Sequence, residues 1–248
     1  MLRMIDTLVN SNQLRINPEA DHAEPDASGS ALLVAATRRR MSVADRERYI
    51  VRGAITFFAE QGLNAQMRDL ALAIGVTHTL VYHYFPTKQA LLDRVYLEVF
   101  EGRWKPEWEA LLDNRELSVE DKLNSFYIDY ARTILTRDFV RILIFSGLTD
   151  RSITDRFFKM LKERLFPRLI RETRRYRGSR SRARPNVREH ELLMGLHGGV
   201  FYGGLRSFVY GQALHPDLPA LDDAATIADR VRSYLASSMV LEPIGSGN

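Results

Sequence analysis

The chain has 248 residues, 45% of them hydrophobic and 27% charged, so it can build one or two ordinary globular domains. The absence of cysteine excludes disulfides and thiolate chemistry, and a formal net charge of +4 permits a nucleic-acid partner without requiring one. No apolar run approaches the roughly 20 residues of a membrane-spanning helix, and the N-terminus lacks the apolar core of a secretory signal. We therefore expect a cytoplasmic protein.

Residues 1–36 show no sustained periodicity, and their composition over 17–30 predicts a disordered extension. From residue 43 onward the hydrophobic residues recur at helical spacing, which predicts an all-α fold without strands. A first helix ends at Gly62 and a short second one covers 66–73. Ser118 and Ser152 are expected to cap later helices, and Pro167 to kink or split one. The further predicted helices cover residues 88–103, 119–135, 138–148, 153–176, 188–210 and 221–239.

The segment 75–88 predicts a turn followed by a very short helix. Gly75 enters the left-handed conformation without a Cβ penalty, which suits a reversal between two helices. Thr77 supplies a hydroxyl N-cap for a helix over 78–84. Two short helices joined by a tight Gly-containing turn are typical of a helix-turn-helix unit, whose second helix enters the major groove of DNA.

The short helix is followed by a stop and a new helix. Phe85 precedes Pro86, which disfavours helical geometry at Phe85 and ends the helix. Thr87 then caps the next helix, and Lys88 is its first residue. A lysine there opposes the helix dipole. A bound phosphate would relieve that cost, because the helix N-terminus and the ammonium both attract an anion.

These features belong to a longer pattern over residues 44–94. It consists of Ala54, Phe58 and Gly62, then Met67-Arg68-Asp69-Leu70-Ala71, Ile74-Gly75-Val76-Thr77, Leu80-Val81-Tyr82-His83-Tyr84-Phe85 and Thr87-Lys88-Gln89-Ala90-Leu91-Leu92. The pattern resembles the DNA-binding domain of the TetR/AcrR family of transcriptional regulators. It departs from the family at Gln66, where a hydroxyl cap is usual, and at His78, where a small residue or lysine is common.

The resemblance implies that the short helix and the start of the next one face DNA. Tyr82 and Lys88 suit phosphate contacts, which position the protein without specifying a sequence. His78, Thr79 and His83 suit base edges or thymine methyl groups. The complete predicted DNA-binding set is Arg40, Thr77, His78, Thr79, Tyr82, His83 and Lys88.

Two arginine-rich segments admit two interpretations each. Residues 38–40 form an arm before the first helix that suits the DNA backbone or the minor groove, with a solvated charge run as an equal alternative. Residues 171–188 contain eight arginines around a Ser/Arg/Pro-rich stretch. We interpret that stretch as a mobile, solvated connector between helices, with a second nucleic-acid contact as the alternative.

The resemblance also implies a domain organisation and a dimer. We expect an extension over 1–36, a helix-turn-helix DNA-binding domain over 37–94, a larger helical ligand-binding and dimerisation domain over 95–240, and a tail over 241–248. Small residues recur every fourth position in the 188–210 segment and offer a groove for another helix; a helix broken near 198–204 is the alternative. The predicted dimer-interface residues are Gly195, Gly199, Gly203, Ser207, Val231, Tyr234 and Leu235.

The middle helices are rich in aromatic side chains, which by themselves indicate core more often than a pocket. Members of the resembling family bind a small effector inside this bundle, and few charges lie between these aromatics apart from Arg132 and Arg141. We therefore expect a mainly apolar effector, with an anionic one that meets an arginine as the alternative. The predicted liners are Trp104, Phe126, Tyr130, Phe145 and Phe158.

No constellation in the sequence singles out an enzyme. The six histidines lack metal-ligand spacing, and no glycine-rich loop has the residues that cradle a phosphate, so we expect no metal, cofactor or catalytic residue. The resulting hypothesis is a homodimeric, ligand-responsive regulator that binds double-stranded operator DNA, a repressor rather than an activator. An apolar-ligand carrier and a helical-bundle enzyme, each with a vestigial DNA-binding domain, are the alternatives.

Overall fold

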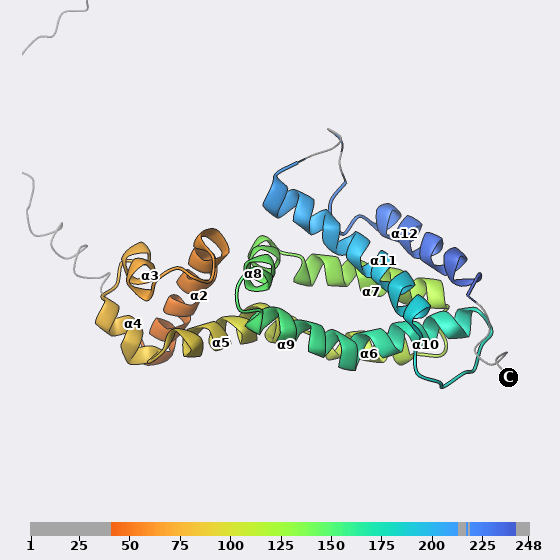
Figure 1. The fold of residues 1–248 in the computed structure, drawn as a ribbon, viewed down its shortest axis with the longest axis horizontal. Coiled ribbons are helices and arrows are strands. Elements are labelled where there is room, and N and C mark those ends of the chain that lie inside the picture. The colour runs from red at the N-terminus through yellow and green to blue at the C-terminus, as the bar shows by residue number, and fades with distance from the viewer. Residues whose placement is uncertain (1–40, 213–216, 218, 242–248) are drawn as a thin grey trace, which may run out of the picture. The chain divides into compact units, whose positions relative to one another are not determined.

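The computed structural model describes residues 41–212, 217 and 219–241. The predicted extension, Arg40 and most of the predicted tail lie outside the described residues. Internal contacts divide the chain into residues 1–42 and residues 43–248, and every described helix belongs to the second unit. The described residues form helices and no strands, which confirms the all-α prediction (Figure 1). None of the described helices is long and apolar enough to cross a membrane.

The helices follow the predicted order, except that the sequence did not predict a helix between residues 103 and 119, where α6 lies. The N-terminal group is α2 (Val43–Gln61), α3 (Met67–Ala73), α4 (His78–Tyr84) and α5 (Lys88–Val99), followed by a 3-10 turn, Glu101–Arg103. The remaining helices are α6 (Pro106–Asp113), α7 (Val119–Ile134), α8 (Arg137–Gly147), α9 (Ser152–Met160), α10 (Phe166–Tyr176), α11 (Val187–Leu205) and α12 (Ala224–Ser238). Single π-helical turns, Leu161–Leu165 and Arg206–Tyr210, follow α9 and α11.

The long predicted helix over 153–176 is divided in the way that Pro167 predicts. Pro167 has no N–H for the helical ladder and stands at the start of α10, directly after the π-helical turn Leu161–Leu165. The prediction that Ser118 caps α7 is also confirmed, because its hydroxyl oxygen accepts from the Asp121 N–H at 3.0 Å.

The prediction that Ser152 caps α9 is wrong. The N-cap position is Arg151, which adopts left-handed geometry at φ 61°, and the Ser152 hydroxyl has no hydrogen-bond partner among the described residues. The cap comes from α8 instead: the fully buried Ser146 hydroxyl accepts from the Ile153 and Thr154 N–H groups at 3.1 and 3.2 Å. A hydroxyl distant along the chain therefore satisfies the unpaired donors.

Two buried ion pairs join the long helices. Lys122 of α7 is fully buried and bonds to Glu172 of α10 and to the carbonyl of Leu112 at 3.0 Å. Arg174 of α10 donates two hydrogen bonds to Glu189 of α11, at 2.7 and 2.6 Å, with both side chains at most 5% exposed. Removing one member of such a pair leaves an uncompensated buried charge and costs about 3–5 kcal/mol.

Helix α11 continues through its glycines, which confirms the helical interpretation over a break near 198–204. The glycines bring other parts of the same chain close. A Cβ on Gly199 would lie 2.8 Å from Nη1 of Arg230 on α12, and one on Gly203 would lie 3.0 Å from Cδ2 of Leu221. A Cβ on Gly195 would meet no atom within 4 Å. Gly199 and Gly203 therefore allow close packing within the chain, whereas Gly195 has free space beside it.

Candidate nucleic-acid interface

Helices α3 and α4 are joined by a tight turn whose geometry follows from local chemistry. Gly75 has φ +68°, the left-handed conformation that the sequence predicts. Thr77 is the N-cap of α4, and its hydroxyl accepts from the Leu80 N–H at 3.2 Å. Gln66 is the N-cap of α3 but forms no side-chain cap bond. The second helix of the pair is therefore capped and the first is not.

The turn is fastened to α2 by two contacts that sequence reasoning missed. The Tyr49 hydroxyl donates to the carbonyl of Ile74 at 2.7 Å. Gly53 lies so close to Ile74 that an added Cβ would come within 2.4 Å of its Cγ2 atom. A glycine inside a helix costs roughly 1 kcal/mol relative to alanine. Gly53 in the middle of the first predicted helix was the signal that another segment approaches there.

One face of α4 is buried and the other is exposed. Val81 is fully buried, and Phe85, just after the helix, is 6% exposed. His78, Thr79, Tyr82 and His83 are all exposed, Tyr82 to 39%. The side chains of these four residues form no hydrogen bond with any residue that the structure describes, although the rings of His78 and Tyr82 pack edge to face at 4.6 Å. Their polar atoms are thus available to a partner outside the chain.

Tyr84, the last residue of α4, does not share this exposed face. It is half-buried and packs against the hydrophobic core, with its ring 5.4 Å from that of His83. The exposed set on α4 therefore ends at His83.

Thr87 and Lys88 begin α5 as predicted. The Thr87 hydroxyl accepts from the Ala90 N–H at 3.0 Å, and Lys88 is the first helical residue. The Lys88 side chain is half-buried, with its ammonium 6.0 Å from the centre of the Phe58 ring. Partial burial lowers the pKa of Lys88, and the nearby Asp150 carboxylate opposes that shift. The Lys88 ammonium and the N-terminus of α5 would together attract an external anion.

Residues 50–95, which hold this arrangement, match the model of the tetR family of bacterial regulatory proteins. Residues 50–95 are a TetR-family domain. The match begins inside α2 and ends inside α5, so it contains α3, the turn and α4. The resemblance noted from the sequence is confirmed for this part of the chain.

Solved structures extend the similarity to the TetR-family fold as a whole. A TetR-like transcriptional regulator from Rhodococcus sp. RHA1 is 16% identical, with a TM-score of 0.58 over 82% of this chain and 100% of that one. The fatty acid degradation regulator FadR from Bacillus halodurans is 17% identical, with a TM-score of 0.56 over 79% and 97%. A tetR-family regulator from Streptomyces coelicolor is 14% identical, with a TM-score of 0.53 over 82% and 85%. At this identity the likeness shows the fold alone. No curated protein matches the chain in sequence.

The five predicted effector liners do not lie together in this TetR-family fold. Trp104, Phe126 and Tyr130 share one aromatic cluster, in which each ring lies 5.4–5.8 Å from that of Trp108. Phe158 contacts a different ring, Phe157, at 6.0 Å. Phe145, the fifth predicted liner, packs against Arg141 of the same helix, α8, with its ring 5.6 Å from the guanidinium.

The aromatic cluster contains buried polar atoms without partners. The imidazole of His197, on α11, lies 5.3 Å from the Tyr130 ring and 6.1 Å from the Tyr127 ring. The Tyr127 hydroxyl and Nδ1 of His197 are buried and form no hydrogen bond with any described residue. Burial lowers the pKa of His197 to about 4, so the imidazole is neutral at pH 7. The cluster therefore combines packed aromatic rings with two buried neutral polar groups that have no hydrogen-bond partner among the described residues.

The predicted dimer residues fall into two groups. Val231, Tyr234 and Leu235 are at most 5% exposed within this chain, because α12 turns that face toward α7, α10 and α11. Gly195 and Ser207 of the α11 segment are exposed. A groove of about 410 Å³ runs between α11 and α12 on the outer side; among its lining residues are Leu192, Gly195, Leu196, Ser233 and Ser237.

In the part of the chain that the structure describes, no three His, Asp or Glu side chains are placed to share a metal ion.

Proposed function

We propose that this chain is a homodimeric transcriptional regulator that binds operator DNA in the cytoplasm and is released by a small, mainly apolar effector. The observation that carries the proposal is the exposed face of α4, whose polar side chains have no partner among the described residues while its opposite face is fixed to the core. An exposed polar face on a firmly held short helix is what insertion into a major groove requires.

In this proposal the predicted DNA-binding residues divide the work. Tyr82 and Lys88 hold phosphates, and Lys88 does so where the α5 N-terminus adds its own attraction. His78, Thr79 and His83 read base edges. Thr77 caps α4 and also faces the sugar-phosphate backbone of the DNA. Arg40 extends the contact as an arm.

The dimer is proposed to form across the groove between α11 and α12. The exposed Gly195 lets a helix of the second copy approach closely. Ser207 is exposed farther along the same row, whereas Gly199 and Gly203 pack against Arg230 and Leu221 of their own chain. Val231, Tyr234 and Leu235 support this surface from behind, because they anchor α12 in the core. Two copies would present two reading helices to a two-fold operator.

The effector is proposed to enter the aromatic cluster of α7 and its neighbours. Trp104, Phe126 and Tyr130 would supply the apolar walls, while Phe145 and Phe158 lie outside this cluster and would respond only indirectly. A ligand with one neutral polar group would satisfy the Tyr127 hydroxyl or the His197 imidazole. A ligand that separates these helices would shift the population toward a state with weaker DNA affinity.

DNA binding is tested by fluorescence anisotropy with duplexes from the upstream region of the gene and with scrambled duplexes, at several salt concentrations. Tyr82→Ala and Lys88→Ala should weaken binding to both duplexes, and Lys88→Ala should lower the salt slope of the dimer by about 1.8, since each protomer loses one phosphate contact. Thr79→Val and His83→Ala should reduce mainly the preference for the upstream duplex.

Lys162→Ala is the matched control, because this lysine is exposed and belongs to the turn after α9. Binding that shows no preference for any upstream duplex, or an equal loss in Lys162→Ala and Lys88→Ala, would contradict the proposal.

The dimer is tested with Gly195→Leu, since an added side chain there meets no atom of its own chain within 4 Å. Light scattering should show a halved mass, while the helical circular dichroism signal stays intact. Gly199→Leu is less informative, because it collides with Arg230 in the same chain. An unchanged mass for Gly195→Leu would place the dimer interface elsewhere.

A further inference from the structure

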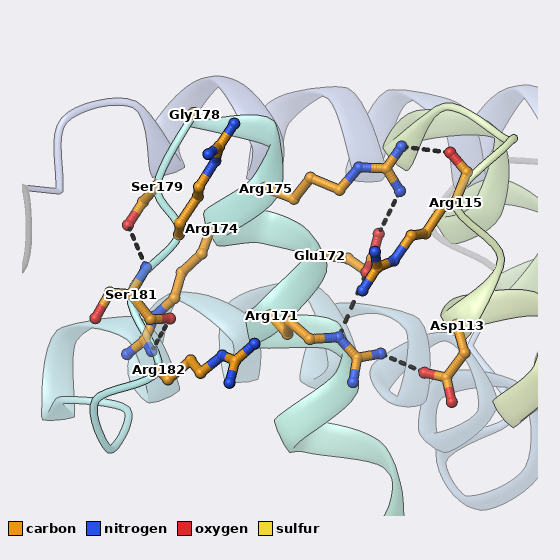
Figure 2. A pocket seen from close by; sticks show the side chains of 11 residues that line it. Asp113, Arg115, Arg171, Glu172, Arg174, Arg175, Gly178, Ser179, Ser181 and Arg182 are labelled. Carbon is orange, nitrogen blue, oxygen red and sulfur yellow. Dashed lines mark hydrogen bonds and ion pairs between the residues drawn. The ribbon is translucent and has the colours of Figure 1, made fainter.

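We propose that the arginine-lined pocket at the end of α10 is a binding site for a small molecule that carries two or more phosphate groups. The pocket has a volume of about 790 Å³, within the range of roughly 300–1,000 Å³ typical of small-molecule sites. Side chains from α10, from the 114–118 turn and from the loop after α10 converge on it (Figure 2). Its six arginines are Arg115, Arg171, Arg174, Arg175, Arg180 and Arg182.

The pocket contains fewer carboxylates than guanidinium groups, and both carboxylates are already engaged. Asp113 is paired with Arg171. Glu172, 4% exposed, is bonded to the buried Lys122 and lies 3.4 Å from Arg175. Neither acid is left to neutralise the remaining arginines, so the pocket carries a positive charge that an external anion would balance.

Three of the arginines have no partner within the described chain. The guanidinium groups of Arg115, Arg180 and Arg182 form no hydrogen bond or ion pair with any residue that the structure describes. All three are exposed, and in Figure 2 the side chain of Arg182 extends from the loop toward Arg171 on α10. Guanidinium groups that line one concave space repel one another, and an anion between them relieves that repulsion. Planar forks of this kind match phosphate oxygens in a bidentate manner.

The other arginines hold the scaffold that presents these three. Arg174 donates to the carbonyls of Ala183, at 2.7 Å, Ser181, at 3.3 Å, and Arg184, at 3.4 Å, while its remaining bonds go to Glu189. The loop predicted to be a mobile connector is therefore tied to a buried ion pair. Arg175 donates to the carbonyl of Arg115 at 2.8 Å and fixes the opposite wall. A site whose walls are fixed before binding loses less entropy when a ligand enters.

The test uses the full chain and inorganic tripolyphosphate, with ATP and adenosine as further probes, in buffer without divalent cations. Isothermal calorimetry should show saturable binding of tripolyphosphate and ATP and none of adenosine. Arg180→Ala/Arg182→Ala should weaken tripolyphosphate binding by at least about tenfold, because two charge-assisted contacts are lost. Arg184→Ala, exposed in the same loop but outside the pocket lining, should change it by less than about twofold.

Three outcomes would overturn the proposal. The first is no saturable heat with tripolyphosphate or ATP while circular dichroism shows a folded chain. The second is an equal loss in Arg184→Ala, which would indicate a diffuse charge effect. The third is a loss of duplex DNA affinity in Arg180→Ala/Arg182→Ala without any tripolyphosphate binding by the unmodified chain, which would assign the surface to nucleic acid.

Discussion

His197 provides a quantitative test of how the helical bundle is packed. Its imidazole is 5% exposed and lies among the rings of Tyr127, Tyr130 and Phe166 at 5.3–6.1 Å, with no charged group in those contacts. Burial lowers its pKa to about 4 in the folded chain, whereas an unfolded histidine titrates near 6.5. Between about pH 6.5 and pH 4, His197 therefore binds a proton in the unfolded chain but stays neutral in the folded chain.

The sign and size of the effect follow from this difference. Stability should fall as the pH decreases from about 6.5 toward about 4, and the loss attributable to His197 should reach about 2.5 kcal/mol at pH 4.5. Tyr127 and Tyr130, whose pKa values are raised by burial, stay neutral throughout this range. Carboxylates titrate in the same window, so the effect must be read as a difference between two proteins.

The assay is urea unfolding followed by circular dichroism at several pH values from 7.5 to 4.5. His197→Phe keeps a ring in the cluster and removes the titratable group, so its stability should decline less than that of the unmodified chain, by about 2.5 kcal/mol at pH 4.5. His190→Phe, on the same helix but half-exposed, is the control and should follow the unmodified chain. Parallel curves for His197→Phe and the unmodified chain would refute a buried, neutral imidazole.

Three further predictions concern the elements that position the reading helix and the arginine pocket. Gln66→Ser should stabilise the chain by about 0.5–1 kcal/mol in urea unfolding, because α3 has no side-chain cap. Thr77→Ala should destabilise the chain by about 1 kcal/mol, because α4 loses its cap. If both variants changed the free energy of unfolding in the same direction by the same amount, the cap assignment would be contradicted. Gly53→Val should cost about 1–3 kcal/mol by displacing Ile74, and should weaken DNA binding in the anisotropy assay without altering α4 itself. Arg174→Met should cost about 3–5 kcal/mol in urea unfolding, since its buried carboxylate partner loses its main counter-charge; a loss below 1 kcal/mol would mean that water reaches the pair.

Local chemistry in the sequence determined the elements around the reading helix. Gly75, Thr77 and Thr87 each act within a few residues of their own position, through a left-handed turn or a hydroxyl cap. Such features depend little on the rest of the fold, which is why the bounds of α4 and the start of α5 could be predicted. The spacing of apolar residues likewise gave the all-α class.

Only the tertiary structure decided which partner each side chain meets. The cap of α9 comes from Ser146 rather than Ser152, because α8 brings a buried hydroxyl to the helix start. Helical periodicity shows that Tyr234 lies on an apolar face but not that the same chain covers that face. Arginines near residue 180 converge on one pocket because Arg174 and Glu189 fold the loop back onto α10. The spacing of apolar residues predicts that one face of a helix is buried. Only the packing of helices that are distant in the sequence determines which residues cover that face.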